Sequence, residues 1–358
     1  MKLLSSDVVE LEHEYKHLSE VVKSVKENSE DILDYLNSSE PSSTFFSFFD
    51  TGSREENNSN FGQLVYWYQK TLRDVVKNLG NDTFTGREKM FNFLEYLRLT
   101  CCNENYQINE NDFADVSLIP ELSYSRMNAA LLGKGVCSAQ SKFLKDLITY
   151  SKALPYGRVT TQTIFVPKGL HDIVVLNSED ENRAITLDPQ NYVGSVSSVK
   201  RGFDCKKRLL DDSFEGKGFR TTKKDLLKAR ETVLDYCVRK YGIDKLAHRD
   251  FQGASPEEQI EKIERFISSY TTNCKHALNF DTISVQGHEF EVGKFFEMAC
   301  HACGIPYELE VPSKEDRAHT VIVLPTINRK IDFTQKPKLA TSTKENGPIY
   351  VKTLSLIH

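Results

Sequence analysis

Three side chains with the chemistry for covalent catalysis follow one another along the chain: Cys137, His171 and Asp188. A cysteine thiolate is a nucleophile, an imidazole can take up and return its proton, and a carboxylate can hold the imidazole in one tautomer. Such a set attacks an acyl group and carries it as a thioester. The chemistry requires that the elements carrying the three residues converge.

Cys137 lies where a helix is predicted to begin. Gly133 and Gly135 punctuate the chain just before it. The apolar residues that follow recur with helical spacing: Phe143, Leu144, Leu147 and Ile148. The unpaired N–H groups and the dipole of a helix's first turn favour the thiolate form of a cysteine. The alternative is that Cys137 is a small buried apolar residue, as most free cysteines are.

The residues after this helix predict three antiparallel strands. Residues 159–166 are rich in β-branched side chains and end at a Pro-Lys-Gly turn. His171 opens a second strand, and residues 183–187 form a third that ends at Asp188. Because adjacent antiparallel strands bring cross-strand side chains together, we expect His171 to meet Asp188, and the packed helix to present Cys137 to the imidazole.

This order of motifs resembles a known family. Gly-x-Cys on a helix, His leading a strand and Asp-Pro closing the next strand resemble the transglutaminase-like superfamily, a branch of the papain-like thiol enzymes, over residues 130–195. The resemblance implies an α+β fold with a helix packed on an antiparallel sheet. It implies Cys137 as nucleophile, His171 as base and Asp188 as the orienting acid.

The same resemblance implies a reaction class. It predicts a cysteine-dependent enzyme that attacks amide bonds of a protein or peptide, as a peptidase, a deamidase or a transglutaminase, with no cofactor. Hydrolysis and amine transfer both stay open, because they differ only in what resolves the thioester. The alternative from another class is a catalytically inactive scaffold or partner-binding protein built on the same fold.

Composition narrows the surroundings of this chemistry. The 358 residues carry 46 basic and 51 acidic side chains, a net charge of -5, which predicts no nucleic-acid partner. No apolar run reaches the length of a membrane span, and the first residues lack the apolar stretch of a signal peptide. Together with eight cysteines in so long a chain, this predicts a reducing compartment, the cytoplasm.

Residues 1–120 are predicted to form a helical domain. An apolar stripe with helical spacing runs through Val8, Leu11, Tyr15, Leu18, Val22 and Val25. It is either the inner face of a bundle helix or a coiled-coil surface for a protein partner. Residues 41–60 are predicted to form a Ser/Gly/Asn-rich linker. Its four phenylalanines must be buried, and the linker could therefore be a substrate lid or pack against the catalytic half. Further helices are expected at 61–79 and 89–99, with Cys101 and Cys102 as core thiols.

The last third contains a degenerate echo of the first motif. After predicted helices at 223–241 and from Ser255 onward, the run beginning Gly293-Lys-Phe resembles the one beginning Ser141-Lys-Phe. His319-Thr-Val-Ile-Val-Leu similarly resembles His171-Asp-Ile-Val-Val-Leu, and Asp332 parallels Asp188. Alignment on the shared Lys-Phe puts Glu289 where Cys137 stands. Internal similarity predicts a second copy of the fold, and the missing thiol predicts that it is silent.

These features give four predicted segments. They are a helical domain (1–120), the catalytic domain (121–215), a helical connector (216–272) and the degenerate copy (273–358). A rival interpretation of the last segment is zinc, since Cys274, His276, Cys300 and Cys303 could form a four-ligand set. The two last cysteines fit an amphipathic helix as core residues, so no metal is expected.

Overall fold

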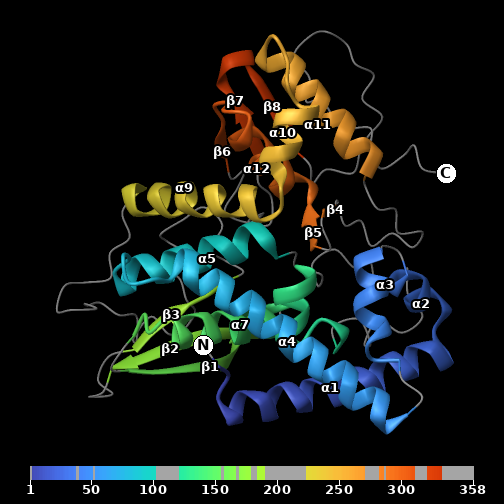
Figure 1. Ribbon diagram of the computed structural model, residues 1–358. Helices are drawn as coiled ribbons and strands as arrows, with labels where there is room; N and C mark the ends of the chain where they lie inside the picture. The colour runs from blue at the N-terminus through green and yellow to red at the C-terminus, as the bar shows by residue number, and fades with distance from the viewer. Residues whose placement is uncertain are drawn as a thin grey trace.

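The computed structural model describes residues 2–37, 40–50, 53–101, 121–154, 157–166, 169–178, 184–189, 223–270, 282–285, 288–310 and 321–332. Within these ranges helices combine with three small antiparallel sheets, so the predicted α+β class is confirmed at this level. Figure 1 shows helix α9 (Lys223–Lys240) lying between the N-terminal helices and the C-terminal elements.

The N-terminal part contains α1 (Ser5–Asn28), α2 (Glu30–Leu36), α3 (Glu40–Ser47), α4 (Arg54–Leu79) and α5 (Gly86–Thr100). Both α4 and α5 begin earlier than their apolar spacing predicted, because polar side chains cap them. Ser53 accepts the Glu56 N–H at 3.2 Å, and Thr85 and Glu88 form a reciprocal capping box.

The apolar stripe of α1 faces into the molecule, which confirms it as the inner face of a packed helix. Leu11, Leu18 and Val25 are each at most 1% exposed. These side chains therefore offer no coiled-coil surface to a partner.

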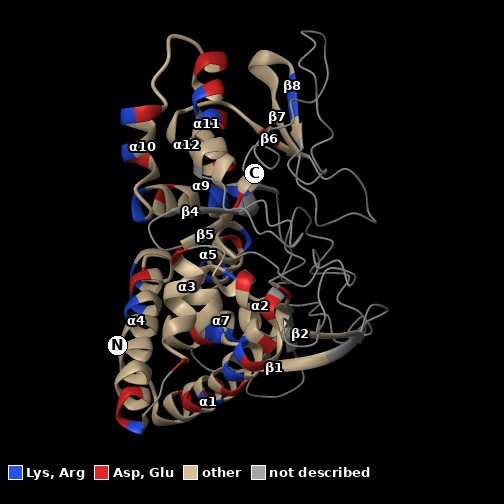
Figure 2. Ribbon diagram, turned by 90° about the vertical axis from the view of Figure 1, so that its right-hand side faces the viewer, with Lys and Arg blue, Asp and Glu red and all other residues tan. Residues whose placement is uncertain are grey.

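Basic side chains are interspersed with acidic ones along α1 and α11 (Pro256–Tyr270) and do not gather in one stripe (Figure 2).

The prediction of a linker at residues 41–60 is wrong. Helix α3 and the start of α4 occupy most of it, with residues 51–52 outside the described ranges. Phe45, Phe46 and Phe49 are buried, and the Phe49 ring lies 5.2 Å from that of Tyr15 on α1. The polar composition misled because two buried phenylalanines on α3 and a third just after it outweigh weak helix propensity.

The middle of the chain forms a helix on a sheet. A π-helical turn (Asn128–Leu132) leads into α7 (Cys137–Tyr150), followed by β1 (Gly157–Val166), β2 (Gly169–Ser178) and β3 (Ala184–Leu187). The sheet order is β1-β2-β3, with Ile164 opposite His171 and Val174 opposite Leu187. Phe143, Leu144, Leu147 and Ile148 of α7 are buried, as their spacing predicted.

The C-terminal part repeats this order. Helices α9, α10 (Ile243–Asp250) and α11 precede a hairpin of β4 (Thr282–Val285) and β5 (His288–Glu291). Then come α12 (Val292–Ala302) and an antiparallel sheet of order β6-β7-β8. Its strands are β6 (Glu308–Glu310), β7 (Val321–Leu324) and β8 (Arg329–Asp332). Helix α10 was not predicted; it has eight residues, and only Ile243 and Ala247 are buried.

The two helix-and-sheet units share a register. In the second unit Asp332 pairs with Val321, which follows His319 by two positions. Extending the β2–β3 ladder by one residue past Leu187 puts Asp188 opposite Ile173, two positions after His171. The two aspartates therefore occupy the same place relative to their histidine strands. His319 itself lies outside the described residues.

The alignment of Glu289 with Cys137 is wrong in structural terms. Lys142 is the sixth residue of α7, but Lys294 is only the third of α12, so α12 starts later. Glu289 lies in strand β5, opposite Ser284. His288 and Phe290 are both buried and lie two positions apart on β5, which is the side-chain spacing of a strand. The alignment treated this stretch as part of a helix. The helix position of Cys137 is taken in α12 by Val292.

One continuous set of buried apolar side chains extends from α1 to β8. The boundaries predicted at 120/121, 215/216 and 272/273 fall in, or at the edge of, segments outside the described residues. Among the described helices, none combines the length and apolar composition that crossing a bilayer requires.

Candidate functional site

Cys137 is the first residue of α7, and its free thiol is half-buried. The preceding residue, Val136, has extended backbone and supplies no side-chain cap, so no side chain at the cap position accepts the first N–H groups of the helix. This is the setting that the glycine punctuation and apolar spacing predicted.

The turn before Cys137 is held tightly from two sides. The Val136 N–H donates to the Ser123 carbonyl at 3.2 Å, and the buried Gln140 donates through Nε2 to the Gly135 carbonyl at 2.8 Å. A Cβ atom on Gly135 would lie 2.8 Å from the Ala139 Cβ. Glycine at 135 therefore allows the turn to lie against the first turn of α7.

The imidazole and the carboxylate meet as the strand pairing predicted. His171 Nε2 lies 2.8 Å from Asp188 Oδ2. Their side chains are 5% and 13% exposed, so water screens the pair weakly. With Nε2 facing Asp188, Nδ1 is the ring nitrogen that can exchange a proton with the thiol.

The charge state of His171 links all three residues. Burial by itself lowers the pKa of the ring, but the hydrogen bonds and charges of Asp188 and Cys137 outweigh it and raise the pKa to about 10. The ring is therefore an imidazolium at neutral pH. The protonated ring also hydrogen-bonds Cys137, so a proton donor lies beside the sulfur.

The structure thus brings Cys137, His171 and Asp188 together around a partly exposed sulfur. The other described thiols differ. Burial raises the pKa of Cys101 to about 12 and of Cys303 to about 11, and it also raises the pKa values of Cys237 and Cys300. A raised pKa leaves these thiols protonated and unreactive at neutral pH.

Tyr124 also belongs to the site, and no sequence pattern pointed to it. Its side chain is 40% exposed, although its neighbours Ser123 and Ser125 are at most 2% exposed. Burial, followed by the charges of Cys137, Glu121 and Asp172, raises the pKa of Tyr124, so its phenol keeps its proton. The ring is thus an aromatic surface close to the sulfur, and only the tertiary fold places it there.

Only two of the four residues of the alternative zinc set lie within the described residues. Cys274 and His276 lie outside the described residues. Cys300 is fully buried in α12 and Cys303 is half-buried at its end. Within the described ranges no three His, Cys, Asp or Glu residues are grouped as metal ligands would be.

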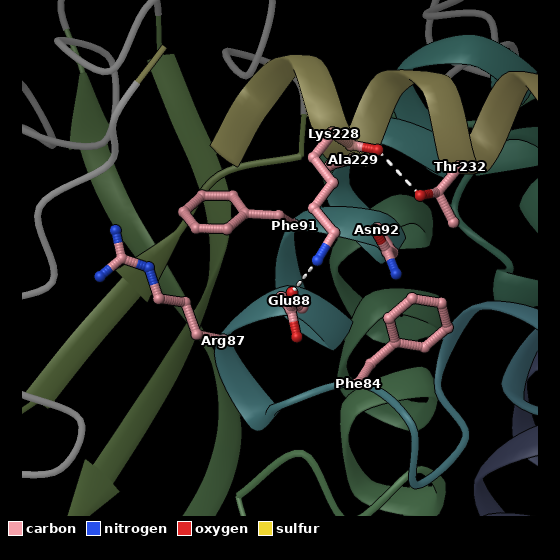
Figure 3. A pocket seen from close by; sticks show the side chains of 8 residues that line it. All are labelled: Phe84, Arg87, Glu88, Phe91, Asn92, Lys228, Ala229 and Thr232. Carbon is pink, nitrogen blue, oxygen red and sulfur yellow. Dashed lines mark hydrogen bonds and ion pairs between the residues drawn. The ribbon is translucent and has the colours of Figure 1, made fainter. Parts of the chain in front are cut away.

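A separate hollow, with none of the three predicted residues in its lining, lies between the start of α5 and the first turns of α9 (Figure 3). Phe84 and Phe91 flank it, and Lys228 and Glu88 form an ion pair across it at 2.5 Å. It contains neither a thiol nor an imidazole, so we assign it no chemistry.

Comparison with protein-family models, with curated proteins and with solved structures finds no match to this chain. The geometry of Cys137, His171 and Asp188 is therefore what indicates a function.

Proposed function

We propose that the protein is a cysteine-dependent acyl-transfer enzyme that acts on amide bonds of a protein or peptide. The observation that carries the proposal is the Cys137–His171–Asp188 chain around a partly exposed sulfur at a helix start. The Cys137 thiolate attacks the amide carbonyl, and the backbone N–H of Cys137 donates to the developing oxyanion. The Tyr124 ring lies beside the incoming substrate.

The proton balance uses the imidazolium. Collapse of the tetrahedral intermediate breaks the C–N bond, and His171 gives its proton to the departing amine, leaving a thioester on Cys137. Water or a second amine then attacks the thioester, and His171 takes the proton of that nucleophile as the thiolate leaves. Asp188 orients the ring and stabilises its charge throughout.

The fold that we propose for this reaction is the transglutaminase-like one, with an inactive second copy. In support, a helix followed by three antiparallel strands occurs twice, and Asp188 and Asp332 take equivalent register positions. Val292 at the helix position of Cys137 supplies no nucleophile. The cytoplasm suits the reaction, because all five described cysteines are free and a reducing compartment keeps them so.

Competitive alkylation tests the proposal. With limiting iodoacetamide at pH 6, we expect Cys137 to be labelled at least about tenfold faster than the other seven thiols, as judged by mass spectrometry of the peptides. His171→Ala should remove this advantage and slow acyl transfer about 10²–10⁴-fold. Equal labelling of all thiols would contradict the proposal.

Incubation with a labelled primary amine and candidate proteins separates the reaction classes. Incorporated amine identifies a transglutaminase, a mass increase of about 1 Da at glutamine a deamidase, and new termini a peptidase. Cys137→Ala should abolish each of these products. Products that persist in this variant would exclude Cys137 as the nucleophile, whereas no product from the unaltered protein would favour the scaffold interpretation.

A further inference from the structure

A hydrogen bond beside the thiol–imidazole contact connects the helix that carries Cys137 to the strand that carries His171. Ser141 lies one turn after Cys137 on α7, and its side chain is fully buried. Its Oγ donates to the backbone carbonyl of Asp172 at 2.8 Å. Asp172 directly follows His171 on β2, so the bond spans the site one residue away from its base.

This hydrogen bond fixes the position of β2 along α7, which apolar packing alone does not determine. Apolar contacts between α7 and the sheet hold the two layers together, but the hydrophobic effect is non-directional and does not by itself select one pair of facing residues. A hydrogen bond is directional and has a narrow range of lengths, so it also fixes which residue of β2 faces which turn of α7. The β2–β3 ladder ends at Val174 and Leu187, so this stretch of β2 lies beyond the paired part of β3.

We propose that Ser141 is a positioning residue that holds the imidazole of His171 in line with the sulfur of Cys137. The inference rests on the proposed acyl-transfer function. Ser141 touches neither the substrate nor the reacting atoms. It acts through the Asp172 carbonyl, and its loss lets β2 shift relative to the start of α7. Misplacement of about 1 Å at a catalytic pair costs on the order of 100-fold in rate.

The test is the pH profile of Cys137 alkylation in the full-length chain. In the proposed enzyme the His171 imidazolium beside the sulfur keeps Cys137 more reactive at pH 6 than the buried thiols, whose pKa values are raised. In Ser141→Ala we expect the rate at pH 6 to fall about 10- to 100-fold and the profile to move toward that of an ordinary thiol. The comparison is made where circular dichroism shows each variant to be folded, because an unfolded chain presents Cys137 as an ordinary thiol.

A size-matched pair repeats the comparison without a cavity. Ser141→Thr keeps the hydroxyl donor and should retain the native profile, while Ser141→Val has nearly the same shape, lacks the donor and should lose it. Thr149→Ala is the control, because Thr149 donates to the Lys145 carbonyl at 2.8 Å on the exposed side of the same helix. Its profile should match that of the unaltered protein.

The outcomes separate the two proposals. If Cys137 of the unaltered protein is no more reactive than the other thiols, the proposed function fails. If Cys137 is reactive and both Ser141→Ala and Ser141→Val keep its rate and pH profile, the enzymatic proposal stands and the role of Ser141 is overturned.

Discussion

At the scale of single residues, protonation distinguishes the candidate site from the rest of the chain. The other described thiols lie in apolar surroundings that favour the neutral form, whereas Cys137 bonds an imidazole that carries a proton at neutral pH. His171 gains that proton only because Asp188 and Cys137 both face it in the folded state. The interactions that hold this proton therefore also contribute to folding.

This linkage predicts how stability depends on pH. The pKa of His171 is about 10 in the folded chain and about 6.5 when unfolded, so folding retains a proton between these values. The contribution is fully present below pH 6.5 and is lost as pH rises through 10. We expect urea unfolding free energy to fall from pH 6.5 to pH 10 more steeply in the unaltered protein than in His171→Gln.

Asp188→Asn provides the matched comparison, because it removes the carboxylate that holds the proton but leaves the ring. Its unfolding free energy should depend on pH less steeply than that of the unaltered protein. Parallel curves for the three proteins would show that His171 does not hold an extra proton in the folded state.

At the scale of elements, the site depends on how α7 starts. Gly133 has φ of 78°, the left-handed region that glycine adopts without strain, and ends the π-helical turn. Gly135 is required for a different reason, because its missing side chain makes room for Ala139. The sequence showed both glycines and the thiol after them, but not that Gln140 and Ser123 hold the turn in place.

Gly135→Ala tests the close approach. The new Cβ would lie 2.8 Å from the Ala139 Cβ, so the turn or the first turn of α7 must shift. We expect a loss of about 1–3 kcal/mol in unfolding free energy and slower alkylation of Cys137. Gly62→Ala is the control, because a Cβ there meets nothing within 4 Å. Equal stability and equal thiol reactivity in both variants would contradict the role given to Gly135.

At the scale of the whole molecule, two buried ion networks join distant segments. Arg126 binds Glu14 of α1 and Asp146 of α7, each at 3.0 Å. Arg98 of α5 binds Glu297 of α12 at 2.9 Å. A buried charge without its partner is costly, so each network makes the segments that it joins fold together.

These networks also mark where sequence reasoning ends. Periodicity located α1, α4, α5, α7, α9 and α11, because each buries one face at regular spacing. The order of the motifs located Cys137, His171 and Asp188. Ser141, Tyr124 and Arg98 gave no local signal, since their partners lie far away in the chain and depend on tertiary packing. The linker prediction for residues 41–60 was wrong because it relied on polar composition. The alignment of Glu289 with Cys137 was wrong because it relied on a shared Lys-Phe and ignored the strand spacing around Glu289.

The last prediction concerns coupling between the C-terminal unit and the N-terminal helices. Glu297 of α12 is 2% exposed and, with Glu95, balances Arg98 and Arg230. Glu297→Met leaves an uncompensated positive charge in that cluster and should lower the unfolding free energy by about 3–5 kcal/mol. Trp67, the one tryptophan of the chain, lies on α4 and reports unfolding at a distance from α12. If the networks unite the molecule, the midpoint of Trp67 fluorescence in urea shifts together with that of the far-UV circular dichroism.

The control is Lys262→Ala, which breaks a partly exposed ion pair with Glu258 on α11 and should change stability by less than about 1 kcal/mol. A Trp67 midpoint that stays fixed in Glu297→Met while the circular dichroism shifts would mean that the two parts unfold independently.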